Sequence, residues 1–291
     1  MQAKRFDIVI IGAGNVAWHL GHQFKAAGHN IVQVYNRGIE RGEELAVELN
    51  CENTNTLDGI NKNADIYILA VSDHGIDDII LGLRLEGKVV AHTSGSVPLK
   101  GMEYISAECG IFYPLQTLTR RNPVSFKGVP IFIEAANENV TRILTELAES
   151  IGGKVYYLAG NKRRAVHVAA VFANNFTNYL YGISRQIMDR EKLPFDMLFP
   201  LLQETLNKIK DNDPHEIQTG PARRADYKTI EEHLKYLAHR EDQREVYLVL
   251  AECILNLYKD SSKVIEADDK LLEELIDEDF DFDELDEDSI L

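Results

Sequence analysis

The chain has 291 residues, of which 45% are hydrophobic, and a formal net charge of −16. This length is ample for two domains. No apolar run approaches the roughly 20 residues that cross a bilayer, so the composition excludes a membrane-spanning protein. The opening segment, MQAKRFDIVIIG, leads straight into a strand pattern without a signal peptide, and the three cysteines suggest neither a disulfide framework nor a metal site. We therefore expect a cytoplasmic protein.

The negative charge is concentrated in residues 264–291. This tail contains fourteen acidic residues and one lysine, so it carries −13 of the −16 and leaves −3 for the rest of the chain. Such a balance argues against nucleic-acid binding, because the tail would repel phosphates. The composition is typical of a solvated, disordered segment. Alternatively, Phe280, Phe282 and Leu285 could anchor the tail in a basic groove of a protein partner.

The first part of the chain alternates between strand and helix patterns. Continuous Val/Ile runs indicate strands that are buried on both faces, and their alternation with helices predicts a parallel sheet. We therefore predict an α/β fold with a Rossmann-type, doubly wound and mainly parallel sheet over residues 1–158. In chain order the expected elements are strand 6–12, helix 15–28, strand 30–36, helix 40–49, strands 65–72, 88–94, 109–115 and 129–135, helix 138–153 and strand 154–160.

The second part of the chain contains helical patterns only. Helices are expected over 162–190, 195–210 and 227–260. The sequence thus predicts three regions: a nucleotide-binding domain at 1–158, an all-helical domain at 159–263 for substrate binding and dimerisation, and the acidic tail at 264–291.

A glycine-rich loop follows the first strand. Gly12, Gly14 and Ala17 form the pattern GxGxxA at the start of the first helix. In a dinucleotide-binding turn, these positions permit the tight turn, the close approach of a pyrophosphate, and helix–strand packing. The helix N-terminus then offers free N–H groups to the anion. The residues expected to contact the cofactor here are Gly12, Ala13, Gly14, Asn15 and Val16.

The end of the second strand distinguishes between NAD and NADP. An NAD site usually has Asp or Glu there for the ribose 2′-OH, whereas Arg suits a 2′-phosphate. This chain has Asn36 and Arg37, with Arg41 one turn later, and Arg37 can hold a phosphate with two hydrogen bonds. We therefore predict NADP as the cofactor, with Asn36 and Arg37 contacting it. The alternative is that both arginines are ordinary solvated charges.

Polar residues follow the next two strands, at the edge of the sheet where ligands bind. At the end of the strand pattern at 65–72, Val71 and Ser72 are expected to contact the cofactor. Ser72 could instead cap the following helix, and His74 is interpreted as an exposed loop residue.

The segment HTSGS at 92–96 supplies further hydroxyls. Thr93 is assigned to the cofactor, and Ser94 and Ser96 to the substrate, because hydroxyls and N–H groups beside a glycine can hold a carbonyl or a carboxylate. The alternative is that Ser96 caps a helix that begins near residue 97. Gln116, in the cluster Tyr113, Gln116 and Thr117, is also assigned to the substrate.

These motifs together resemble a known family. The opening GAGNVA, the Asn-Arg pair, HTSGS, FYPLQTLT, HVAAVFANNFTNYLYG and TGPARRAD look like bacterial NADP oxidoreductases that join a Rossmann domain to a helical C-terminal domain of unknown function. The resemblance covers residues 5–260. The layout is more distantly similar to the β-hydroxyacid dehydrogenases and to pyrroline-5-carboxylate reductase. It implies the fold and the cofactor rather than a substrate.

The segment VHVAAVFANNFTNYL at 166–180 is interpreted as one buried helix with a polar stripe. At about 100° per residue, His167, Asn174 and Asn178 should share one face. The β-hydroxyacid dehydrogenases carry a catalytic Lys one turn before an Asn on the corresponding helix, but this chain has Ala170 and Val171 at those positions. Their acid therefore cannot be transferred to this sequence.

Histidine can still supply a proton to an alkoxide, and an amide can orient its oxygen. His167 is accordingly predicted to be the general acid, with Asn174 beside it as a catalytic residue and Asn178 binding substrate. The alternative is that the asparagines form hydrogen bonds across a dimer interface.

Two functions remain open at the level of the sequence. The first is an NADP(H)-dependent oxidoreductase that reduces a small carbonyl or imine compound, as a homodimer through its helical domain. The second is a non-catalytic NADP(H)-binding sensor or scaffold whose acidic tail docks a partner. Arg223 and Arg224 could bind an anion, although a surface pair is the simpler interpretation.

Overall fold

The computed structural model describes residues 4–120 and 122–258. The acidic tail, including its expected docking residues, lies outside this part of the chain. The chain divides into two compact units, one that ends at Leu180 and one that begins at Tyr181. The domain boundary that the sequence predicts between residues 158 and 159 remains a prediction. Each unit is described by itself.

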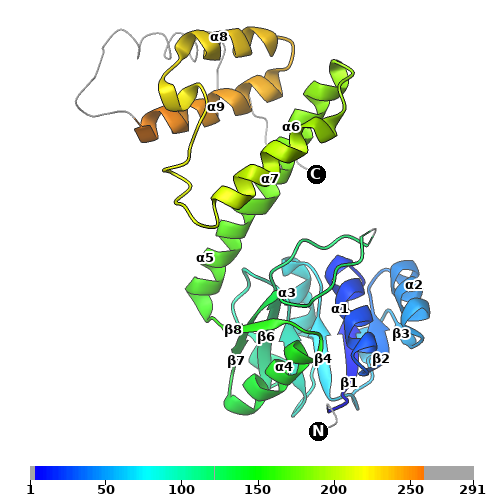
Figure 1. Cartoon of the computed structure of the whole chain (residues 1–291). Coiled ribbons are helices and arrows are strands. Elements are labelled where there is room, and N and C mark those ends of the chain that lie inside the picture. The colour runs from blue at the N-terminus through cyan, green and yellow to red at the C-terminus, as the bar shows by residue number, and fades with distance from the viewer. Residues whose placement is uncertain (1–3, 121, 259–291) are drawn as a thin grey trace. The chain divides into compact units, whose positions relative to one another are not determined.

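The first unit is built on one eight-stranded sheet (Figure 1). Its strand order, β3-β2-β1-β4-β5-β6-β7-β8, contains the Rossmann order in its first six strands. All neighbours are parallel except β6 and β7. The fold prediction of a doubly wound, mainly parallel sheet is confirmed. The strands are β1 (Asp7–Ile11), β2 (Asn30–Tyr35), β3 (Glu52–Thr54), β4 (Ile66–Leu69), β5 (Val89–His92), β6 (Cys109–Pro114), β7 (Pro130–Ala135) and β8 (Lys154–Tyr157).

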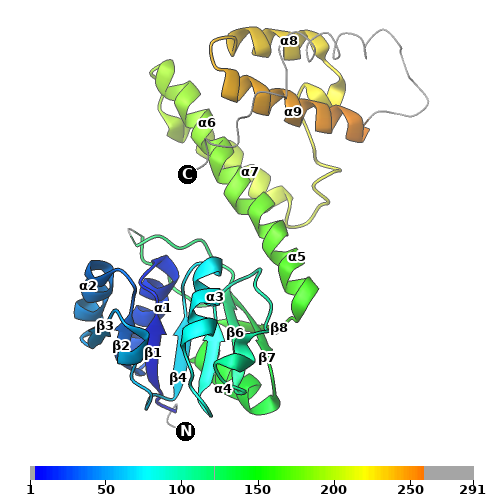
Figure 2. The same ribbon diagram turned by 180° about the vertical axis from the view of Figure 1, so that it is seen from behind.

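Two apolar cores cover the two faces of this sheet. On one face α1, α2 and α4 bury Leu20, Leu45 and Leu144 against the strands. On the other face α3 and two short 3-10 helices bury residues such as Ile76 and Met102. Figure 1 shows α1 and α4 on one face of the sheet, and Figure 2, which views the molecule from behind, shows α3 on the other face. The helices are α1 (Asn15–Ala26), α2 (Ile39–Leu49), α3 (Asp73–Gly82), α4 (Glu138–Ser150), η1 (Leu57–Gly59) and η2 (Met102–Tyr104).

Burial explains why the central strands could be found from sequence. Every residue of β4 and β5 is buried, as is β1 apart from Asp7, which agrees with their continuous apolar runs. The three-residue strand β3 was not expected, because Glu52–Thr54 is polar and pairs only at the edge of the sheet.

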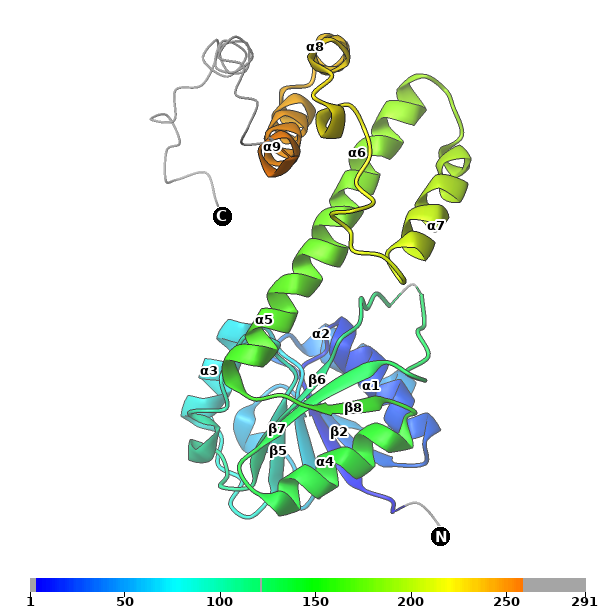
Figure 3. The same ribbon diagram turned by 60° about the vertical axis from the view of Figure 1, so that its left-hand side comes forward.

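The helix expected over 162–190 is interrupted. After β8 the chain enters α5 (Gly160–Ala170), continues through a π-helical segment at Val171–Phe176, and then forms α6 (Thr177–Arg190) (Figure 3). The Thr177 hydroxyl donates to the Phe172 carbonyl, five residues earlier, at 3.1 Å. A π turn contains almost one residue more than an α turn, so by Asn174 the side-chain direction lags the α-helical expectation by roughly a fifth of a turn.

Two expectations about this helix are therefore wrong. The polar stripe assumed uniform α-helical rotation, which the π segment interrupts between His167 and Asn174. The segment is also not buried within the single chain. Val168, Phe172 and Phe176 have exposed fractions of 50%, 65% and 52%.

The second unit is helical throughout its described part. It contains the end of α6, the 3-10 helix η4 (Phe195–Leu198), α7 (Phe199–Lys208), the 3-10 turn η5 (Ala222–Arg224), α8 (Tyr227–Tyr236) and α9 (Glu241–Tyr258). Its small core joins η5, α8 and α9 through Ala222, Ile230, Leu234, Ala251 and Leu255. Arg223 lies over the ring of Tyr258 at 4.0 Å from its centroid. Among residues 4–120 and 122–258, no helix has the length and apolarity needed to span a membrane.

Candidate functional site

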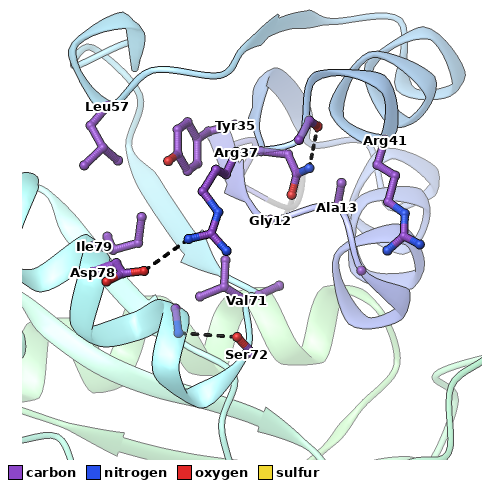
Figure 4. Close-up of a pocket in the computed structure, with 15 residues that line it drawn as sticks. Gly12, Ala13, Tyr35, Arg37, Arg41, Leu57, Val71, Ser72, Asp78 and Ile79 are labelled. Carbon is purple, nitrogen blue, oxygen red and sulfur yellow. Dashed lines mark hydrogen bonds and ion pairs between the residues drawn. The ribbon is translucent and has the colours of Figure 1, made fainter. Parts of the chain in front are cut away.

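A cavity of about 540 Å³ opens at the carboxyl ends of β1, β2 and β4 (Figure 4). This is the position where the strand order reverses, between β1 and β4, and where doubly wound sheets bind ligands. Seven residues that the sequence assigned to the cofactor line it: Gly12, Ala13, Gly14, Asn36, Arg37, Val71 and Ser72. The additional lining residues are Tyr35, Gly38, Arg41, Leu57, Ala70, Gly75, Asp78 and Ile79.

The two glycines of the loop have different roles. Gly12 has φ +114°, and a Cβ atom there would lie 2.3 Å from the Ala70 carbonyl oxygen. Its N–H donates to the Tyr35 carbonyl at 2.7 Å, which closes the turn onto β2. A Cβ on Gly14, in contrast, would meet nothing within 4 Å. Gly12 therefore serves the fold, whereas Gly14 leaves open space on the cavity side.

The N-terminus of α1 is suited to an anion. Its N-cap, Gly14, has no side chain to accept from the first N–H groups, and the first turn contains no acidic residue. These donors and the positive end of the helix dipole favour a phosphate group. By contrast, Ser72 caps α3, with its hydroxyl accepting from the Gly75 N–H at 3.3 Å. The alternative reading of Ser72 as a helix cap is confirmed, and it also lines the cavity.

Two arginines line the side of the cavity near β2. Arg37 reaches toward Asp78, with 3.5 Å between Nη1 and Oδ2, and both side chains are largely exposed (Figure 4). Arg41 lies on the side of Ala13, and its guanidinium makes no hydrogen bond or ion pair within the described ranges. Burial raises the pKa of Tyr35 more than the Arg37 charge lowers it. The site thus presents two cations and one carboxylate.

Three of the cofactor residues expected from sequence do not line the cavity. Asn15 and Val16 form the first turn of α1. Thr93 is buried, and both its N–H and its hydroxyl donate to the Leu69 carbonyl, at 3.0 and 3.3 Å. That bonding joins the end of β5 to the end of β4.

One residue that the sequence did not implicate, Arg120, lies against the glycine loop. The Arg120 guanidinium donates to the Ala13 carbonyl and lies 3.6 Å from a Glu44 carboxylate oxygen. The neighbouring Thr119 carbonyl is 3.1 Å from a ring nitrogen of His19 on α1. Arg120 is therefore a third cation at this loop, brought there by a chain segment about a hundred residues away.

The loop that follows β5 is held by its own hydrogen bonds. The Ser94 hydroxyl accepts from the N–H groups of Ser96 and Val97, at 3.1 and 3.0 Å. The Ser96 hydroxyl donates to Asp73 at the start of α3, at 3.0 Å. The expected helix near residue 97 is absent there, since the next helical turn is η2 at Met102–Tyr104. Substrate binding by Ser94 and Ser96 remains a prediction.

His92, at the end of β5, supports the same loop from the protein interior. It is fully buried, and its Nδ1 accepts from the Ser94 N–H at 3.2 Å. Burial, followed by the nearby Arg163 charge, lowers the pKa of His92 to about 4. The imidazole is therefore neutral near neutral pH.

Arg163 on α5 fixes this loop from the other side. Its side chain is only 1% exposed, and it donates to the carbonyls of Ser94, Gly95 and Val97 at 3.1, 2.7 and 2.7 Å. Its Nε lies 3.5 Å from the Glu134 carboxylate on β7. The buried charge is thus compensated, and α5 is joined to the carboxyl end of the sheet.

His167 lies one helical turn after Arg163. Its Nδ1 is 3.0 Å from the Tyr113 hydroxyl at the end of β6. A Cβ on Gly95 would lie 2.7 Å from that Nδ1 and 2.8 Å from Tyr113 Cζ. Only a glycine at position 95 therefore lets the loop meet this pair of rings.

The other expected site residues lie elsewhere. Gln116 is exposed, and its Oε1 accepts from the Thr117 N–H at 2.8 Å. Asn174 and Asn178 are exposed on the π-helical segment and on α6. Of the side chains assigned to catalysis and substrate, the structure groups His167 with Ser94 and Ser96, and adds Tyr113, Gly95 and Arg163.

The fold and the cavity together define a dinucleotide-binding protein of the Rossmann class. Comparisons with known proteins agree with this class. Residues 7–94 match the family described as NADP oxidoreductase coenzyme F420-dependent, and residues 129–254 match a domain of unknown function, DUF2520. No protein with a curated description matches the chain.

One solved structure is a close relative. It is a Bacteroides fragilis protein assigned as an NADP oxidoreductase, with 36% identity, a TM-score of 0.81 and coverage of 87% of this chain and 98% of that chain. The chain therefore belongs to this family of NADP oxidoreductases, whose cofactor is NADP.

Two more distant structures share the fold. An imine reductase from Myxococcus stipitatus in complex with NADP+ has 17% identity and a TM-score of 0.58, with coverage of 88% and 94% of the two chains. A 1-pyrroline-5-carboxylate reductase from Streptococcus pyogenes has 12% identity and a TM-score of 0.59, with coverage of 86% and 99%.

Proposed function

We propose that this NADP oxidoreductase reduces the C=O or C=N bond of a small compound, with NADPH as the hydride donor. The observation that carries the proposal is the proximity of a nucleotide cavity to a proton-bearing pair. The cavity ends at Val71 and Ser72 after β4, and the His167–Tyr113 pair contacts the loop after β5. Hydrogen bonds from Thr93 to Leu69 and from Ser96 to Asp73 join these two loops.

The residues of the cavity fit an NADP molecule. Its pyrophosphate would lie at Gly14 and the uncapped N-terminus of α1, where an added Cβ meets nothing. Arg37 would bind its 2′-phosphate, because a guanidinium holds a phosphate with paired hydrogen bonds, and Arg41 would be a second cation beside it. Arg120 places one more cation beside the loop.

The charges around the loop after β5 indicate the class of substrate. The Ser96 hydroxyl, expected to hold a substrate carbonyl or carboxylate, already donates to the Asp73 carboxylate, so a second carboxylate at this position would be repelled. A neutral carbonyl or a C=N group is better suited to that surrounding than an anion. The fold neighbours include enzymes named for imine and pyrroline reduction, which supports including C=N compounds.

The proposal is tested with purified protein, NADPH, and a panel of small ketones, 2-oxo acids, cyclic imines and iminium ions. NADPH consumption is followed optically and the reduced product by mass spectrometry. We expect turnover with at least one ketone or imine, and faster turnover with NADPH than with NADH. Tight NADPH binding without turnover of any compound would contradict a reductase and favour the alternative of a nucleotide-binding sensor.

We also propose that the protein is a homodimer that covers the face formed by Val168, Phe172, Phe176 and Tyr179. Each of these side chains is at least half exposed in the single chain, and the rings of Phe172 and Phe176 meet edge-on with 5.1 Å between their centroids, so these two lie on the same side of the helix. Apolar side chains in such a row are typical of an association surface. Asn174 and Asn178 are exposed beside them, as the alternative role across a dimer interface requires.

The oligomeric state tests this proposal. Light scattering coupled to gel filtration should give a dimer for the wild type and a monomer for Phe172→Asp with Phe176→Asp. The matched control is Leu81→Asp, because Leu81 is 79% exposed on α3, away from this face. A monomeric wild type, or dissociation of the control, would contradict the interface.

A further inference from the structure

We propose that Tyr113 is the residue that hands a proton to the substrate, and that His167 acts behind it as the group that restores the proton. This inference rests on the proposed reductase function and adds a catalytic residue to it. Tyr113 carries no catalytic role in the sequence-based prediction, which assigned the proton to His167 alone.

The two side chains form a fixed pair. The Tyr113 hydroxyl and His167 Nδ1 are 3.0 Å apart, although the residues are 54 positions apart in the chain. The Tyr113 ring stacks on Phe132 with 5.9 Å between ring centroids, and it meets the His167 ring edge-on at 5.8 Å. The helix that carries His167 is held one turn earlier by the three carbonyl bonds of Arg163. The pair is thus positioned before any ligand binds.

The pair lies where a substrate would meet the reactive end of the cofactor. Gly95, which contacts both rings, belongs to the loop after β5, and that loop is bonded to Leu69 and Asp73 on either side of the cavity-lining residues 70–72. In doubly wound sheets, the ligand lies across these carboxyl ends. No other tyrosine among residues 4–120 and 122–180 has a hydroxyl bonded to a histidine.

The surroundings of the two side chains indicate which of them gives its proton to the substrate. Burial raises the pKa of Tyr113 above its ordinary value, although the Arg163 charge opposes this, so the phenol carries its proton near neutral pH. The same Arg163 charge stabilises the phenolate that forms when the proton leaves. The tyrosine hydroxyl, with one proton and free lone pairs, can bond to His167 and to a substrate atom together.

With a ketone, the substrate oxygen receives its proton from Tyr113. NADPH, when bound, supplies a hydride, which is a proton with two electrons. As a new C–H bond forms at the carbonyl carbon, the π electron pair moves onto oxygen. The Tyr113 O–H bond breaks, its proton forms the O–H bond of the alcohol, and the phenolate takes the proton held at His167 Nδ1. As Nδ1 gives up its proton, Nε2 of the same ring takes one from solvent, so the charge of the imidazole is unchanged. A neutral imine takes the same proton on nitrogen.

A permanently charged substrate separates this role from a structural one. An N-methylated cyclic iminium ion accepts a hydride and becomes a neutral amine, so it needs no proton. Tyr113→Phe retains the ring that packs on Phe132 and removes only the hydroxyl. We expect Tyr113→Phe to lower the kcat for a ketone or neutral imine by about 100-fold or more and the rate for the iminium ion by less than about threefold.

Two controls complete the experiment. NADPH affinity, measured by fluorescence titration, should be unchanged in Tyr113→Phe, and the ring nitrogen chemical shifts of His167 should move, because Nδ1 loses its partner. Tyr104→Phe, at an exposed tyrosine on η2, should leave both rates unchanged.

Wild-type protein without turnover of any substrate overturns both the reductase function and this inference. Turnover by the wild type, with equal losses for both substrate types in Tyr113→Phe, overturns only the proton-donor role. An undiminished ketone rate in that variant overturns it as well.

Discussion

The glycine loop after β1 and the cluster around Arg163 differ in how their parts are brought together. The loop is made by neighbours in the sequence, and Gly12 and Gly14 act through their backbone and through the side chains they lack. The cluster joins Gly95, Tyr113, Arg163 and His167, which lie on three separate segments. A binding feature made by the local backbone can be recognised as a motif, whereas a cluster of side chains depends on the whole sheet.

The largest effect is expected in the cluster, at its buried charge. Arg163→Met removes the donor to three carbonyl groups and leaves Glu134 without its buried cation, so we expect a loss of about 3–5 kcal/mol in the free energy of unfolding. Arg164→Met changes an exposed arginine at the next position and should cost less than about 0.5 kcal/mol. Denaturant titration measures both. Similar losses in the two variants would contradict the anchoring role of Arg163.

The two glycines of the loop give a second, matched test. Gly12→Ala introduces a Cβ that would lie 2.3 Å from a carbonyl oxygen, in a left-handed conformation. It should therefore destabilise the ligand-free protein by about 2–4 kcal/mol. Gly14→Ala should leave that stability nearly unchanged and weaken NADPH binding by about tenfold or more, because its Cβ enters the space for the pyrophosphate. Thermal unfolding with and without NADPH separates the two effects, and an unimpaired affinity in Gly14→Ala would place the pyrophosphate elsewhere.

The difference between the glycine loop and the cluster explains which site residues could be predicted from the sequence. The strands β1, β4 and β5 are buried on both faces, so their apolar runs were informative. Seven of the cofactor residues were found because they come soon after the ends of β1, β2 and β4. Arg120 and Asp78 were missed because neither belongs to the local motif: Arg120 reaches Ala13 from a distant segment, and Asp78 faces the cavity from the second turn of α3.

The helix at 160–190 shows a different limit. The sequence carried no sign of the π segment at Val171–Phe176, which adds nearly one residue to a turn and separates His167 from Asn174. The tyrosine partner of His167 lies on β6, so no helical periodicity could reveal it. Arg163 was not singled out from the sequence, because a sequence does not show that three backbone carbonyls converge on it.

A third effect is expected from His92, the buried histidine that bonds to the loop held by Arg163. The pKa of His92 is about 4 in the folded chain against 6.5 for an unperturbed histidine, so the unfolded chain binds the proton more readily. Stability should therefore fall as the pH decreases from about 6.5 toward about 4, by up to about 3 kcal/mol in total. His92→Asn retains an acceptor for the Ser94 N–H and removes the titrating group, so it should flatten this dependence. Urea titrations at several pH values measure it, with His74→Asn as the exposed control.

A smaller effect is expected at the edge of the nucleotide cavity. Arg37→Gln should weaken NADPH binding by about 10–100-fold, since a hydrogen bond to a charged group is worth roughly 1.5–3 kcal/mol. NADH, which lacks the 2′-phosphate, should bind this variant and the wild type equally well. Calorimetric titration of both nucleotides tests this, and a parallel loss for NADH would show that Arg37 contacts another part of the nucleotide.

The smallest effect concerns the carboxylate that faces Arg37. Arg37 and Asp78 are 88% and 67% exposed, so their ion pair contributes little to stability. Asp78 nevertheless lines the cavity, where it repels a phosphate and competes for the guanidinium. Asp78→Asn should therefore strengthen NADPH binding by about threefold at low ionic strength and leave NADH binding unchanged. The gain should shrink as salt screens the charge. If Asp78→Asn weakens NADPH binding instead, then Asp78 orients Arg37 for the phosphate, and the nucleotide cavity would depend on a distant side chain in the same way as the cluster around Arg163.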